Sequence, residues 1–114
     1  MPAIYTADIK SDRPAADQAP RRVDMALTMG RMTGAAAVKL IHGYGSGGQG
    51  GRIRTEARRY LHELKTKGKI KAFIPGEDFS IFNGGARSTL QACPALWQDR
   101  DLDRQNKGVT IILL

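Results

Sequence analysis

The residues best suited to chemistry in this chain are a histidine and the glycine-rich stretch behind it. His42 precedes Gly43, Tyr44, Gly45, Ser46, Gly47 and Gly48. Because glycine has no Cβ, backbone N–H groups in such a loop can close on an anionic oxygen. A helix beginning behind the loop would add about half a positive charge, and histidine titrates near neutral pH. The stretch therefore predicts a phosphate-binding site, formed by Gly43, Gly45, Ser46, Gly47 and Gly48, with His42 as an acid or base at its edge.

A block of basic residues follows this loop. The cations are Arg52, Arg54, Arg58, Arg59, Lys65, Lys67, Lys69 and Lys71, against only Glu56 and Glu63. Further along, between Gly76 and Asn106, acids outnumber the basic residues. Phosphate contacts dominate the affinity of proteins for nucleic acids. The basic block beside the glycine loop thus predicts a polyanionic partner, with Arg52, Arg54, Arg58 and Arg59 contacting phosphates, although a solvated helix face would have the same composition.

Composition limits the class of protein. The chain has 114 residues, a net charge of +7, 41% hydrophobic residues and 25% charged residues, which is typical of one soluble globular domain. No apolar run reaches the roughly 20 residues that span a bilayer, and residues 1–10 lack the apolar segment of a secretion signal. Cys93 is the single cysteine, which excludes an internal disulfide. We expect a cytoplasmic protein with one domain over residues 1–114 and no membrane partner.

The elements that must position these residues can be predicted from local patterns. Residues 4–10 alternate as in a strand, and residues 20–32 fit a helix that starts at Pro20. A buried strand over 38–42 then leads into the glycine loop. An amphipathic helix follows over about 51–67, with strands over 70–75 and 109–114. The segment 88–96 could form a short helix. The order predicts a small two-layer α/β sandwich, β-α-β-α-β-β, with a mixed sheet and two main helices.

These elements and motifs together resemble the Smr (small MutS-related) domain over residues 38–114, with an insertion of about 77–106. The His-Gly-x-Gly-x-Gly motif of that family corresponds to His42, Gly43, Gly45 and Gly47. The closing signature corresponds to Gly108, Val109 and Thr110. The family includes DNA-nicking and RNA-cleaving members. The resemblance therefore implies binding of DNA or RNA, including branched nucleic acid, and endonuclease activity.

The first strand departs from the family pattern. Active members carry Leu-Asp-x-His there, whereas this chain has Ala7-Asp8-Ile9-Lys10. Asp8 and His42 would still meet at one sheet edge, so the resemblance implies that His42 transfers a proton or positions the scissile group and that Asp8 orients it. A lysine with a pKa of about 10.4 is a poor general base at neutral pH, so Lys10 is expected to attract phosphate rather than move a proton. This puts cleavage in doubt more than binding.

Two other functions remain open from the sequence. The chain could be a non-catalytic module that docks on nucleic acid or on a ribosome through the same basic helix. Gly43, Gly45 and Gly48 also satisfy the dinucleotide-binding fingerprint, but that site needs an acid about 20 residues further on, at the end of the next strand. Lys65 to Lys71 occupy that neighbourhood, and Glu77 comes later. No cofactor is predicted, and the sequence leaves metal dependence and oligomeric state undetermined.

Several side chains are predicted to be structural. Phe79, Phe82 and Trp97 are interpreted as core anchors rather than base-stacking platforms. Met25, Met29 and Met32 recur at helical spacing and are interpreted as packing residues. His62 is expected at the surface, and Cys93 is expected to be a buried thiol.

Overall fold

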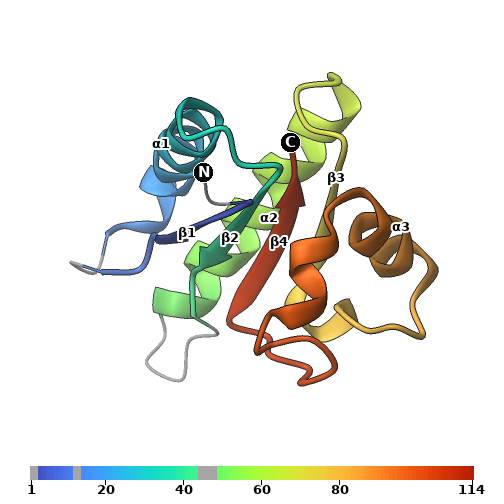
Figure 1. The fold of residues 1–114 in the computed structure, drawn as a ribbon. Helices are drawn as coiled ribbons and strands as arrows, with labels where there is room; N and C mark the ends of the chain where they lie inside the picture. Colours follow the sequence, from blue (N-terminus) through green and yellow to red (C-terminus); the bar gives the residue numbers. More distant parts are fainter. Residues whose placement is uncertain (1–2, 12–13, 44–48) are drawn as a thin grey trace.

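The centre of the fold is a four-stranded mixed sheet (Figure 1). The structure is a computed structural model, which describes residues 3–11, 14–43 and 49–114. The strands are β1 (Ile4–Asp8), β2 (Ala37–Ile41), β3 (Ala72–Pro75) and β4 (Val109–Leu113), in the order β1-β2-β4-β3. The β1 strand is parallel to β2, and β4 is antiparallel to both β2 and β3. The predicted mixed sheet and the predicted order of elements are confirmed.

Two helices cover one face of this sheet, α1 (Ala19–Met32) and α2 (Gln49–Thr66). Pro20 lies in the first turn of α1, where its missing N–H costs no hydrogen bond. The apolar side of α2 carries Ile53, Ala57, Leu61 and Leu64, all of which are buried. They form one hydrophobic cluster with α1 and with residues of β2 and β4. Amphipathic periodicity in the sequence is thus sufficient to place both helices.

The segment of residues 77–106, for which we keep the name insertion from the predicted resemblance, covers the opposite face of the sheet and adds a third layer to the two that were expected (Figure 1). Its helix α3 (Gly84–Ala92) begins earlier than predicted, because the Asn83 side chain caps the amide of Ala86. The helix ends before Pro94, and the chain continues as the short 3-10 helix η3 (Pro94–Gln98). A second hydrophobic cluster lies under this layer: Ala37, Ile74, Phe79, Ala86, Leu90, Cys93, Leu96 and Ile111. None of the described helices has the length and apolar character needed to cross a bilayer.

Several large apolar side chains are exposed, contrary to expectation. Phe79 is buried in the second cluster, as predicted, but Phe82 is 89% exposed and Trp97 is 52% exposed. The interpretation of Phe82 and Trp97 as core anchors was therefore wrong. The methionines of α1, Met25, Met29 and Met32, are also exposed. They lie on the side of α1 that does not face the sheet, since its buried positions are Val23, Ala26, Leu27 and Gly30.

Gly76 packs closely against the backbone at the start of β4, with no room for a side chain. A Cβ at this position would overlap the carbonyl oxygen of Asn106 and lie 2.7 Å from that of Val109. Both obstacles are backbone atoms, which cannot swing away. We expect Gly76→Ala to lower the free energy of unfolding in urea by about 3 kcal/mol. Gly84→Ala is the matched control, because a Cβ there meets no atom within 4 Å. Equal stability of the two variants would contradict the close packing of Gly76.

Candidate functional site

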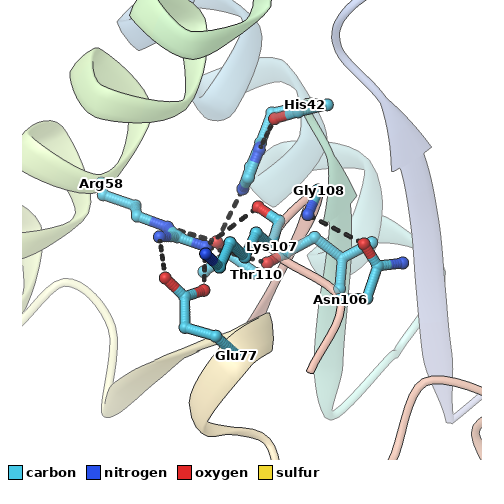
Figure 2. A network of polar contacts seen from close by, with 9 residues as sticks. His42, Arg58, Glu77, Asn106, Lys107, Gly108 and Thr110 are labelled. Atoms are coloured by element: carbon cyan, nitrogen blue, oxygen red, sulfur yellow. Dashed lines mark hydrogen bonds and ion pairs between the residues drawn. The ribbon is translucent and has the colours of Figure 1, made fainter. Parts of the chain in front are cut away.

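His42 lies directly after β2, and its side chain is completely buried. Its Nδ1 is 2.8 Å from the carbonyl oxygen of Gly43, and its Nε2 is 2.8 Å from the Thr110 hydroxyl. A carbonyl oxygen can only accept, so Nδ1 carries the proton and Nε2 accepts from Thr110. Both ring nitrogens are therefore engaged inside the protein (Figure 2).

The Thr110 hydroxyl links His42 to an ion pair between α2 and the segment after β3. Arg58 donates from Nε to Thr110 Oγ1 at 3.1 Å, and its two terminal nitrogens contact the Glu77 carboxylate at 2.9 and 2.8 Å. Arg58 also donates to the carbonyl oxygen of Val109 at 3.2 Å. Figure 2 shows the network running from His42 through Thr110 to Arg58 and Glu77. Because a bidentate pair is strongly directional, this network fixes α2, β4 and the start of the insertion to each other.

The environment of His42 keeps its ring neutral. Burial is the largest cause that lowers its pKa, and the positive charges of Arg58 and Arg54 lower it further. The hydrogen bond to Gly43 and the charge of Glu77 oppose this shift, and the resulting pKa is about 4. At pH 7 the side chain is an uncharged hydrogen-bonding bridge. An acid–base role for His42 would require it to give up one of its two internal hydrogen bonds.

Gly43 turns the chain away from β2 at the start of the glycine loop. Its φ is +72°, a conformation that residues with a side chain rarely adopt. Its amide and that of His42 both donate to the carbonyl oxygen of Gly108, at 3.0 Å each. A Cβ on Gly43 would lie 3.2 Å from Cδ of Lys10, so the lysine stem lies against this glycine. Lys10 therefore lies beside the first residue of the loop.

Asp8 reaches the same edge of the sheet, because it is paired with Ile41 in the parallel register of β1 and β2. Its carboxylate accepts from the amides of Lys10 and Ser11, at 2.9 and 3.0 Å. Burial raises the pKa of Asp8, but these hydrogen bonds and the Lys10 charge outweigh it and leave the pKa below its usual value. The side chain thus caps the turn after β1. It does not bond His42, whose ring nitrogens contact Gly43 and Thr110.

The predicted phosphate-contacting arginines of α2 fall into two groups. Arg58 is occupied by Glu77, and Arg59 pairs with Glu56 at 2.6 Å and Glu63 at 3.0 Å. Within the described part of the chain, Arg52 and Arg54 make no ion pair. Both line an open hollow of about 700 Å³ beside the first turns of α2, which Asp17 and Glu56 also border. Of the four predicted phosphate-contacting arginines, Arg52 and Arg54 are therefore the two that these ion pairs leave available to a ligand.

Two residues of this network, Thr110 and Glu77, were not among the predicted site residues. A signal for Thr110 exists, since it is the one polar residue in the strand Val109–Leu113 and belongs to the closing signature. Glu77 carries no comparable signal, because its partner Arg58 is distant in sequence. The remaining predicted residues, Gly45, Ser46, Gly47 and Gly48, lie outside the described residues. Among those described, no three His, Cys, Asp or Glu side chains form a group that could hold a metal ion.

The fold and the site define a small α/β domain with a mixed sheet and a buried histidine at the end of its second strand. No protein-family model matches the sequence, and a search of curated proteins finds no match. The structure is similar to the crystal structure of the Smr domain of Thermus thermophilus MutS2, with a TM-score of 0.55 and 23% sequence identity. The match covers 96% of each chain. The chain therefore has the Smr fold, which confirms the fold that the sequence motifs implied.

Proposed function

We propose that this chain binds DNA or RNA at the edge of the sheet where β1 and β2 end and α2 begins. The observation that carries the proposal is the presence of two basic residues, Lys10 and Arg54, near the His42–Gly43 corner. Lys10 lies against Gly43, and Arg54 is close enough for its charge to lower the pKa of His42. Arg52 lines the neighbouring hollow with Arg54. Phosphate oxygens are the ligands that such a cluster attracts, and the Smr fold supports the same function.

The geometry favours binding over cleavage. A general base needs a free lone pair, and Nε2 of His42 already accepts a hydrogen bond from Thr110. Asp8 is engaged with backbone amides instead of orienting the imidazole. We therefore propose a nucleic-acid-binding module in which His42 maintains the shape of the corner. Endonuclease activity, with His42 and Asp8 as catalytic residues, is the alternative that the test must distinguish.

Removing the two available arginines tests the binding proposal. We expect Arg52→Gln with Arg54→Gln to weaken binding of a labelled oligonucleotide about tenfold in fluorescence anisotropy at moderate salt. The log–log salt slope should fall by about 1.5 units, since each lost phosphate contact removes about 0.7 to 0.9. The matched control is Lys65→Gln with Lys67→Gln, which removes the same charge at the other end of α2. Equal losses in both variants would mean that net charge alone drives binding.

The same titrations decide between binding and cleavage. Single-stranded RNA, duplex DNA and branched DNA are incubated with the protein, with and without magnesium, and are expected to bind and remain intact. Cuts made by the unaltered chain and lost in both His42→Ala and Asp8→Asn would establish the endonuclease alternative. Failure of every substrate to bind at low salt would overturn the proposed function.

A further inference from the structure

The loop over residues 99–107, within and just after the insertion, turns Asp99 and Asp101 inward, whereas Asp103 and the basic residues are exposed. Asp99 and Asp101 are almost fully buried against Lys39 of β2, with closest Nζ–oxygen distances of 2.9 and 2.5 Å. Arg100, Arg104 and Lys107 are exposed and, within the described residues, make no ion pair. The excess of acids over basic residues between Gly76 and Asn106 therefore does not describe the charge exposed on the surface of this loop. Two of those acids, Asp99 and Asp101, are nearly buried and pair with Lys39.

The three basic residues surround one open hollow of about 670 Å³, which we call the basic hollow. Asp101, Gln105 and Asn106 complete its lining. One carboxylate oxygen of Asp101 contacts Lys39 and the other accepts from the Asn106 side chain, so both oxygens are engaged within the protein and the pairing with Lys39 offsets part of the negative charge. Burial raises the pKa of Asp101, but the hydrogen bonds from Lys39 and Asn106 and the charges of Lys39 and Arg100 leave it below its usual value.

The loop is held firmly and lies against the candidate site. Asn106 accepts the Gly108 amide at 2.8 Å, and Gly108 in turn accepts the amides of His42 and Gly43. The carbonyl oxygen of Lys107 is 3.4 Å from a terminal nitrogen of Arg58. Figure 2 shows Asn106, Lys107 and Gly108 beside Arg58 and His42. Asn106, which lines the basic hollow, is thus linked through Gly108 to the edge of the sheet where β2 ends.

We propose that the basic hollow is a second phosphate-contacting subsite for the same nucleic acid, with Arg100, Arg104 and Lys107 as its ligands. This inference rests on the proposed function and extends it onto the insertion. One strand contacts Lys10, Arg52 and Arg54 at the Gly43 corner and continues past Gly108 onto the 99–107 loop. The insertion then adds binding surface rather than only covering the second face of the sheet.

The test is a triple variant, Arg100→Gln with Arg104→Gln and Lys107→Gln, titrated with a labelled single-stranded oligonucleotide of about 20 nucleotides. We expect its affinity to fall at least tenfold and its log–log salt slope to fall by about 2 units, as three lost phosphate contacts on a single strand require. The matched control is Lys65→Gln with Lys67→Gln and Lys69→Gln, which removes three exposed charges near the C-terminal end of α2. It should leave the slope nearly unchanged.

A charge-preserving variant serves as a control for loss of affinity that results from misfolding. Arg100→Lys with Arg104→Lys retains the positive charges and is expected to bind within about threefold of the unaltered chain. If the unaltered chain binds but the triple variant behaves like its control, the basic hollow is not a subsite and the proposed function stands. If the unaltered chain binds no nucleic acid, the proposed function fails and this inference fails with it.

Discussion

Lys39→Met is expected to lower the free energy of unfolding at pH 7 by about 3 to 5 kcal/mol, the largest change we predict. Methionine preserves most of the length of the side chain but removes the charge that Asp99 and Asp101 share. Two nearly buried carboxylates would then lack their cation, and breaking a buried ion pair on one side typically has this cost. The measurement is urea denaturation of both proteins at pH 7.

Two further variants make this prediction specific. Lys65→Met removes an exposed lysine of α2 and should change stability by no more than about 0.5 kcal/mol. Adding Asp99→Asn and Asp101→Asn to Lys39→Met should recover a large part of the loss, since the uncompensated charges disappear. If Lys39→Met is no less stable than Lys65→Met, the ion pairs of Lys39 with Asp99 and Asp101 do not stabilise the packing of the 99–107 loop on the sheet.

The second large effect is a dependence of stability on pH that arises from His42. Its pKa is about 4 in the folded protein and about 6.5 when unfolded. Between these values the unfolded chain binds a proton that the folded chain does not, so the free energy of unfolding falls as the pH falls. The contribution is fully present above about pH 6.5 and is lost by about pH 4. The total loss is about 3 kcal/mol, on the scale of 1.36 kcal/mol per pKa unit.

Chemical denaturation across pH 4 to 7.5 measures this effect. His42→Gln should lack the decline, whereas His62→Gln should retain it, because His62 is exposed on α2. The difference between the two variants isolates His42 from the carboxylates that titrate at lower pH. A decline of equal size in both would mean that the His42 ring is protonated within the folded protein.

Local signals in the sequence identified the elements around the candidate site. A weakly alternating segment and short apolar runs identified the strands, and the apolar stripe of α2 identified its buried face, because these signals depend only on neighbouring residues. The position of His42 before the glycine loop also followed from order along the chain. The start of α3 was missed because the cap at Asn83 depends on a side-chain conformation that periodicity does not reveal.

Only the tertiary structure decided which charges are available to a ligand. Arg58 forms an ion pair with Glu77 across the interface between α2 and the insertion. Lys39 forms ion pairs with Asp99 and Asp101 on the second face of the sheet. From the sequence we predicted Arg58 as a phosphate ligand and the 76–106 region as acidic, because a count of charged residues treats every charge as exposed to solvent. Pairing between residues distant in sequence depends on strand register and layer packing. The fold therefore divides the four arginines of the basic block into a structural arginine, Arg58, an arginine paired along the surface of α2, Arg59, and two without an ion pair among the described residues, Arg52 and Arg54.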